Sequence, residues 1–320
     1  MRGYEGNTMK PQTYAAYYEN DLRQASSSGG IFSSLATKFD IVYGVAMTDD
    51  CYGTRFIRTE GDISALRGSK YLQATVGDTF KDVKQDLELG RSVLFTGTGC
   101  QVSGLKKFLN KDYENLFCVD VICHGVPSPD LWEMYVKHQE QVRGEKITTV
   151  NFRCKDQGWK AFGIKENQVY TSKSTDPFMQ MFLRNYCLRP SCYQCKARDK
   201  KFSDMTIADF WGIETVAPEM DDDKGISFVI VRNEKAVGLF EEIRTDLKIK
   251  EVSYEEGIRQ NPCEYTSVKR PPERNTFFKD MNSMSFEKLS RKYINLSLMG
   301  KVKRKIKRIL IKLSHKIKGK

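Results

Sequence analysis

The chain has 320 residues, of which 40% are hydrophobic, enough for one large domain or two closely packed ones. No run of residues approaches the roughly 20 apolar positions of a membrane span, and residues 1–20 lack the apolar core of a secretory signal. The formal net charge is +11, but ten of the 52 Lys and Arg lie in residues 301–320, where there is no acid. The rest is nearly balanced against 41 acidic residues, so charge argues against a nucleic-acid partner. We expect a cytoplasmic protein.

Strand-like and helix-like segments alternate through the first half of the chain. Short loops join them, and this alternation predicts an α/β fold with a mainly parallel or mixed sheet and flanking helices. Strands are expected over 12–19, 41–48, 55–58, 92–96 and 116–123, and helices over 31–38, 79–89, 102–109 and 130–143.

The pattern changes at residue 146. We expect an α/β portion over 12–145, a cysteine-containing α+β portion of the same unit over 146–295, and a basic helix over 299–320. Residues 250–295 are mixed and polar, with a break at Pro271-Pro272. In the second portion, strands are expected over 147–153, 162–164, 205–212 and 227–232, and helices over 176–186 and 237–246.

Three loops rich in small residues, 26–30, 97–101 and 123–129, each follow a predicted strand. Ligands collect at the carboxyl ends of strands in such sheets, so we expect the loops to share one edge. In the first loop, Ser28, Gly29 and Gly30 precede a helix and resemble a phosphate cradle, although Ser/Gly runs are more often plain loops. Residues 67–71 offer positive charge to a phosphate, but an exposed loop has the same composition.

Nine cysteines in a chain without an export signal indicate metal or redox chemistry rather than disulfides. Cys187, Cys192 and Cys195 lie within nine residues, and the last two have the spacing that places two thiolates on one metal centre. This spacing favours an iron–sulfur cluster, with structural zinc and buried thiols as alternatives. The best fourth ligand is Cys123, with Cys100 and Cys154 as alternatives. The scattered Cys51, Cys118 and Cys263 are interpreted as small buried hydrophobes.

Two tryptophans lie beside glycines near strand ends. Trp159 follows Gly158, and Trp211 precedes Gly212. An indole stacks on a flat ring system, but core packing is the more ordinary role of such residues.

Several of these segments together resemble the coenzyme F420 hydrogenase/dehydrogenase beta-subunit family. The resemblance covers about residues 12–245 in the right order, and no single motif decides it. The matching stretches are Ser27-Ser-Gly-Gly30, Gly68-Ser-Lys-Tyr71, Gly97-Thr-Gly-Cys-Gln101, Cys123-His-Gly-Val-Pro-Ser128, Phe152-Arg153 with Gly158-Trp159, Cys187 through Cys195, and Ala208-Asp-Phe-Trp-Gly212.

The resemblance implies a flavoprotein that holds FAD and a [4Fe–4S] cluster. It implies electron transfer between a hydride-exchanging substrate or cofactor, such as a deazaflavin, and one-electron carriers. Cys123, Cys192 and Cys195 would bind the cluster, with Cys187 as the fourth ligand and Cys100 as its rival. The residues implied at the FAD are Ser28, Gly29, Gly30, Ser69, Lys70, Tyr71, Gly97, Thr98, Cys100, Gln101, Trp159 and Trp211.

The resemblance also implies a redox partner, and the sequence departs from the family pattern at two points. Relatives often begin with a ferredoxin-like segment, whereas this sequence begins near the flavin-binding portion, so we expect a ferredoxin or another iron–sulfur protein as redox partner. Gly99 replaces the usual proline of its loop. Some bacterial relatives are associated with surface-polysaccharide biosynthesis, which is a further expectation. His124, beside Cys123, is a candidate proton donor or a structural histidine.

Residues 301–320 form a separate feature. Apolar residues at helical spacing alternate with Lys and Arg, which predicts an amphipathic helix on an anionic membrane surface, with an acidic groove, nucleic acid or a solvated tail as alternatives.

Two other functions remain open for the whole chain. One is a non-enzymatic, metal-stabilised scaffold or partner subunit, and the other is a zinc-stabilised transferase.

Overall fold

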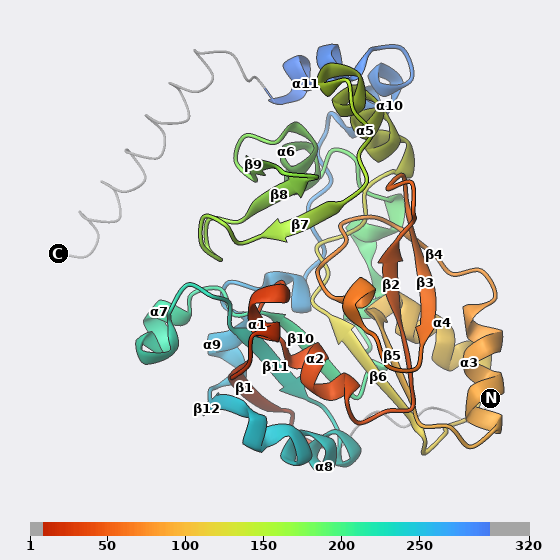
Figure 1. Ribbon diagram of the computed structural model, residues 1–320, viewed down its shortest axis with the longest axis vertical. Coiled ribbons are helices and arrows are strands. Elements are labelled where there is room, and N and C mark those ends of the chain that lie inside the picture. The colour runs from red at the N-terminus through yellow and green to blue at the C-terminus, as the bar shows by residue number, and fades with distance from the viewer. Residues whose placement is uncertain (1–8, 295–320) are drawn as a thin grey trace.

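The computed structural model describes residues 9–294 and contains a large mixed sheet of nine strands (Figure 1). The strand order is β12-β1-β11-β10-β6-β5-β2-β3-β4. The expected α/β class with a mixed sheet is confirmed. The strands are β1 Gln12–Tyr18, β2 Ile41–Met47, β3 Thr54–Thr59, β4 Ala74–Thr75, β5 Val93–Thr98, β6 Leu116–Val121, β10 Met205–Asp209, β11 Ser227–Val231 and β12 Leu247–Glu251.

A second sheet of three antiparallel strands lies beside the first, packed with α5, α6, α10 and α11 (Figure 1). Its strands are β7 Val150–Cys154, β8 Gly163–Glu166 and β9 Val169–Ser172. The helices of the chain are α1 Leu22–Ala25, α2 Ile31–Ala36, α3 Thr79–Glu88, α4 Gly99–Leu109, α5 Pro129–Arg143, α6 Pro177–Leu183, α7 Ile213–Val216, α8 Glu234–Ile243, α9 Tyr254–Ile258, α10 Arg274–Met281 and α11 Phe286–Ile294.

Alternating residues of the central strands build a core on each face of the large sheet. Val42 and Leu94 pack with α2 and α8, whereas their neighbours Tyr43 and Phe95 pack with α3 and α4. This two-sided burial explains why the central strands are almost continuously apolar. Strand β11 is buried at all five positions.

Local sequence signals determine several helix ends. Helix α5 begins after Ser128 with Pro129 at its first position, and Gly144 ends it in the left-handed conformation at φ 71°. Helix α4 starts at Gly99, earlier than the predicted residue 102, because Thr98 and Gln101 form a capping box. The predicted helix over 176–186 ends at Leu183, and Asn185 has a positive φ of 66°.

Other differences concern short or mixed segments. Strand β9 and helices α9 to α11 lie outside the expected elements. With four and five residues, β9 and α9 are too short for a periodic pattern. Helix α11 does place Phe286, Leu289, Tyr293 and Ile294 at helical spacing, within a segment whose composition is mixed and polar. Strands β10, β11 and β12 join the same sheet as β1 to β6. The large sheet is therefore built from chain segments on both sides of residue 145, where we expected the first portion to end. No helix within residues 9–294 is long and apolar enough to cross a membrane. The predicted basic helix over 299–320 lies outside the described residues.

Candidate functional site

The three small-residue loops lie at one edge of the large sheet. Strands β2, β5, β6 and β10 are parallel neighbours, and β1 has the same direction because β11 is antiparallel to both β1 and β10. The loops that follow β1, β5 and β6 therefore all leave from the carboxyl edge, as the sequence predicts.

The cysteine segment joins two of these loops through backbone contacts. Val126 accepts a hydrogen bond of 2.9 Å from the Arg189 amide, and Ser128 donates one of 2.8 Å to Cys187. A Cβ atom on Gly125 would lie 3.3 Å from Cβ of Cys192, so the loop after β6 rests directly on the cysteine segment. A Cβ atom on Gly99 would lie 3.5 Å from Cβ of Ala197, which places the start of α4 against the same segment.

Four thiols gather where these loops meet. Burial raises the pKa of Cys123 to about 12, and the neighbouring Cys100 and Cys192 thiols act in the same direction. Burial also raises the pKa of Cys192, and its neighbours Cys100 and Cys195 add to that rise. Cys100, Cys123, Cys192 and Cys195 are thus electrostatic neighbours drawn from α4, the loop after β6 and the cysteine segment.

Cys187 lies apart from this group. It is fully buried in the core that includes residues of the second sheet, and within residues 9–294 Arg274 is the one charged neighbour that acts on the pKa of its thiol. Cys154 is buried at the end of β7, where Asp156 and Lys165 are its charged neighbours. Cys263, interpreted as a buried hydrophobe, is partly exposed and lies near Cys195 and Arg198.

A single metal ion has no site among the described residues. Within residues 9–294, no three His, Cys, Asp or Glu side chains are close enough to share one ion. A four-iron cluster has a different requirement, since each of its four thiolates binds a different iron and the sulfurs stand apart around the cluster. Cys100, Cys123, Cys192 and Cys195 offer the four cysteine thiolates that such a cluster takes.

Arg198 holds the cysteine loops together. Its guanidinium donates to the carbonyl oxygens of Cys123, at 2.6 Å, of His124, at 3.3 Å, and of Thr266, and the residue is 9% exposed. No carboxylate of the described residues forms an ion pair with it. A buried cation without an acidic partner is costly, and a cluster carrying four thiolates would supply negative charge beside it.

A cavity of about 710 Å³ opens between the first loop, residues 64–70 and strand β7. Ser69 and Lys70 of the predicted set line it, together with Arg67, Arg153 and Lys155. Its volume falls within the range typical of ligand pockets, about 300–1,000 Å³. Predicted residues Ser28, Gly29, Gly30 and Tyr71 follow lining residues in the chain but do not line the cavity themselves.

The cations of this cavity have few anionic partners. Burial lowers the pKa of Lys70 to about 7 and, together with Arg23 and Arg153, that of Lys155 to about 8. Both amines donate to backbone carbonyls. Arg153 pairs with Asp209 at 2.9 Å, but its Nε is buried without a hydrogen-bond partner. These groups fit the diphosphate of a dinucleotide such as FAD, which would provide negative charge.

Hydrogen bonds inside the protein occupy several predicted cofactor residues. Oε1 of Gln101 accepts from the Thr98 amide at 2.8 Å, so this side chain caps α4. Gly97 is the last but one residue of β5. Ser28 donates its hydroxyl to the Ile226 carbonyl at 2.8 Å, which fixes the first loop on β11.

The two predicted tryptophans stack on each other. Their rings are 4.8 Å apart and nearly parallel, at 7°, and Trp159 is 1% exposed. Nε1 of Trp159 donates to Asp209 at 3.1 Å. The arrangement of Trp159 is that of core packing.

Aromatic side chains connect the thiols with the cavity. The ring of His124 lies 5.1 Å from that of Phe182, and Phe182 lies 5.2 Å from Tyr71, which is next to Lys70. Nε2 of His124 lies 2.7 Å from Oδ1 of Asn185. Burial lowers the pKa of His124, which favours the neutral imidazole.

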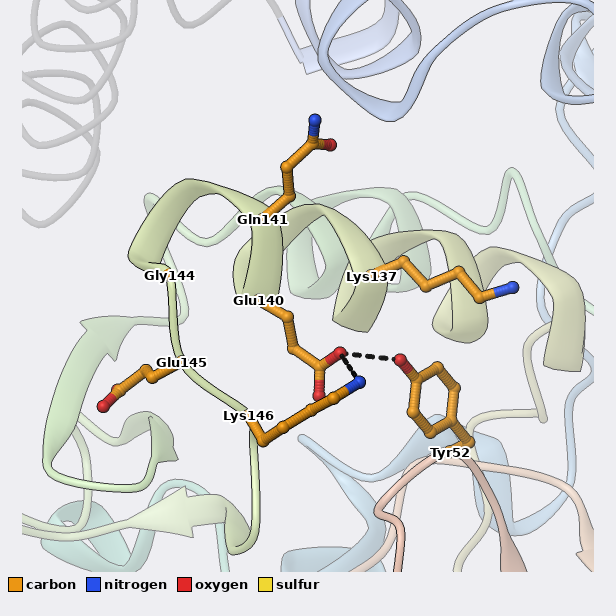
Figure 2. Close-up of a pocket in the computed structure, with 7 residues that line it drawn as sticks. All are labelled: Tyr52, Lys137, Glu140, Gln141, Gly144, Glu145 and Lys146. Carbon is orange, nitrogen blue, oxygen red and sulfur yellow. Dashed lines mark hydrogen bonds and ion pairs between the residues drawn. The ribbon is translucent and has the colours of Figure 1, made fainter.

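A second hollow, of about 440 Å³, lies over α5 (Figure 2). In Figure 2, Glu140 of α5 accepts hydrogen bonds from the Tyr52 hydroxyl, at 2.8 Å, and from Lys146, at 2.9 Å. None of the predicted site residues lines this hollow.

Comparison with known proteins gives the family. The model for the C-terminal part of the coenzyme F420 hydrogenase/dehydrogenase beta subunit matches residues 90–256, more than half of the chain. The chain belongs to this beta-subunit family. That membership confirms the resemblance and makes the protein a redox-linked relative of hydrogenase subunits.

A solved structure supports the same fold for this beta-subunit relative. It is a chain in the xenon-derivatised F420-reducing [NiFe] hydrogenase complex from Methanosarcina barkeri, with a TM-score of 0.56 and 14% identity. The match covers 82% of this chain and 89% of that chain. At this identity it shows the fold alone. No curated protein matches the chain.

Sequence reasoning missed Arg153 and Lys155 as site residues. Arg153 stands in a matching motif, and Lys155 looked like an ordinary surface cation, whereas the basic segment that holds Arg198 fits either the countercharge of a cluster or a solvated face. Only their burial, which follows from tertiary packing, distinguishes them from solvated charges.

Proposed function

We propose that this beta-subunit relative is an oxidoreductase that uses FAD and a [4Fe–4S] cluster. It would transfer electrons between a hydride-exchanging organic substrate or cofactor, such as a deazaflavin, and one-electron carriers. A flavin suits this exchange because it accepts a hydride and releases single electrons.

The observation that carries the proposal is the pairing of two features at one sheet edge. Four thiols from three segments gather there, and a cavity lined by buried cations lies nearby. The ring of Phe182 lies between His124, next to a thiol, and Tyr71, next to the cavity. Family membership adds a redox context.

The residues of this chain would share the work as follows. Cys100, Cys123, Cys192 and Cys195 would bind the cluster, which modifies the expected set by replacing Cys187. Lys70, Lys155 and Arg153 would bind the FAD diphosphate. Thr98 and Gln101 would act indirectly, by fixing the first turn of α4 that carries Cys100.

Anaerobic purification tests the proposal. The protein should be yellow-brown, carry flavin, and hold about four irons per chain. Reduction should give the spectrum of a flavin and the electron paramagnetic resonance signal of a reduced cluster. Colourless protein that holds one zinc would contradict it and favour the zinc-stabilised transferase, and a metal-bearing protein without redox change would favour the scaffold.

Two further parts of the proposal rest on sequence alone. We propose that the protein serves surface-polysaccharide biosynthesis and touches the inner face of the membrane through residues 301–320, which lie outside the described residues. Sedimentation with anionic liposomes checks the second part. Deletion of residues 300–320 should abolish binding, and equal binding of both forms would contradict it.

A further inference from the structure

Exposed cations crowd the surface beside Cys192 and Cys195. Residues 189–201 and 263–270 hold seven Lys or Arg and two acids. Of the acids, Glu264 is 1% exposed and pairs with Lys201 and Arg232, so Asp199 is the only exposed acid there. The exposed cations are Arg189, Lys196, Lys200, Lys269 and Arg270.

These two segments form one continuous face. The amide of Cys195 donates to Oγ of Ser267 at 2.9 Å, and Arg198 donates to the Thr266 carbonyl. Nδ2 of Asn185, which also contacts His124, donates to the Lys269 carbonyl at 3.2 Å. The exposed cations therefore lie on two segments that pack together beside Cys195.

Four of the exposed cations on this face form no ion pair with any residue between 9 and 294. They are Arg189, Lys196, Lys269 and Arg270, and Arg270 donates a hydrogen bond to the neutral Asn275. Tyr265 is 57% exposed on the same face. Tyrosine and arginine are enriched in protein interfaces, whereas a cluster of like charges is costly unless a partner compensates it.

We propose that this basic face, defined by Arg189, Lys196, Lys200, Tyr265, Lys269 and Arg270, docks an acidic one-electron carrier protein of the ferredoxin class. The inference rests on the proposed function for the identity of the partner. Charge complementarity would steer the carrier to the thiol group and place its own cluster close to that of this chain.

Titration calorimetry with an oxidised, negatively charged ferredoxin tests the docking. The double variant Lys196→Glu/Lys269→Glu reverses two charges of the face. The control Lys248→Glu/Lys288→Glu makes the same change at exposed lysines of β12 and α11. We expect the first variant to bind about tenfold more weakly than wild type, the control to bind like wild type, and wild-type affinity to fall with salt.

Equal affinity of the two double variants would overturn the proposal, and so would the absence of ferredoxin binding at low salt. Binding of anionic vesicles by the basic face in place of ferredoxin would also overturn it. Calorimetry measures docking whether or not a cluster is present. Iron and flavin contents, measured on the same samples, test the proposed function separately.

Discussion

At the scale of single residues, Cys100 and Cys187 differ most in their surroundings. Cys100 is exposed at the start of α4 and interacts with Cys123 and Cys192, whereas Cys187 is fully buried in the core. A cluster ligand must face the other ligands, so position relative to them matters more than spacing along the chain.

We therefore expect Cys100→Ser to lose the cluster and Cys187→Ala to keep it. Cys187→Ala removes only a buried sulfur, at a cost of about 1 kcal/mol in unfolding free energy. Iron analysis and the absorption of the cluster at about 400 nm measure the cluster content of each variant. Full iron content in Cys100→Ser together with iron loss in Cys187→Ala would restore Cys187 as the fourth ligand.

Lys70 gives a prediction about pH. Burial lowers the pKa of its amine to about 7, and a bound diphosphate would raise it again. Below pH 7 the amine is already charged, so FAD affinity should be constant; above pH 7 binding must take up a proton, and affinity should fall. Fluorescence titration of FAD between pH 6 and 9 measures this, around a pKa of about 7.

The variant Lys70→Arg is the control for that titration, because arginine stays charged over the whole range. Its affinity should remain constant through pH 7 and begin to fall only near pH 8, where Lys155 titrates. An unchanged profile in Lys70→Arg would show that Lys70 does not face the diphosphate.

At the scale of elements, the first loop depends on close packing against β1 and β11. A Cβ atom on Gly29 would lie 2.4 Å from the Ala16 carbonyl and 2.7 Å from the Ser227 amide. Both are backbone atoms of paired strands, so they have little room to move. The loop that leads to the cavity is therefore fixed by the absence of a side chain at one position.

Gly29→Ala should lower the unfolding free energy by about 1–3 kcal/mol, because the methyl group forces the strands or the loop apart. It should also weaken FAD retention, since Ser27 of the same loop lines the cavity. Gly238→Ala in α8 is the matched control: no atom lies within 4 Å of its added Cβ, and a helical alanine should add about 0.5–1 kcal/mol. Urea denaturation measures both, and equal stabilities would contradict the packing argument.

At the scale of the whole molecule, the thiols connect separate parts of the fold. Cys100 lies in the first turn of α4, which follows β5 of the large sheet, and Cys123 follows β6. Cys192 and Cys195 belong to the segment between α6 and β10. A ligand that binds only the folded state stabilises all the parts it joins. A cluster held by these thiols would thus act on global stability.

We expect iron removal by an anaerobic chelator to lower the unfolding temperature by several degrees. Loss of about 2–3 kcal/mol of linked stability would be enough at this chain length. Scanning calorimetry of loaded and chelated protein measures the shift. The variant Cys100→Ser should have the same unfolding temperature before and after chelation. A full shift of the unfolding temperature in that variant would show that the stabilising iron is not bound by Cys100.

The sequence by itself determined the alternation of strands and helices, because apolar periodicity and capping residues are local. The strand over 12–19, the helix over 130–143 and the shared edge of the three loops all follow from such signals. It also determined the family, since ordered motifs persist in the chain regardless of how they pack.

Only the tertiary structure decided how the pieces combine. The C-terminal strands β10 to β12 join the sheet of the N-terminal half, because pairing depends on contacts between residues far apart in the chain. Packing likewise buries Cys187 and brings Cys100 toward Cys123, and it turns Lys155 and Arg198 from ordinary cations into buried ones. Burial and long-range proximity are properties of the folded chain, and spacing along the sequence does not contain them.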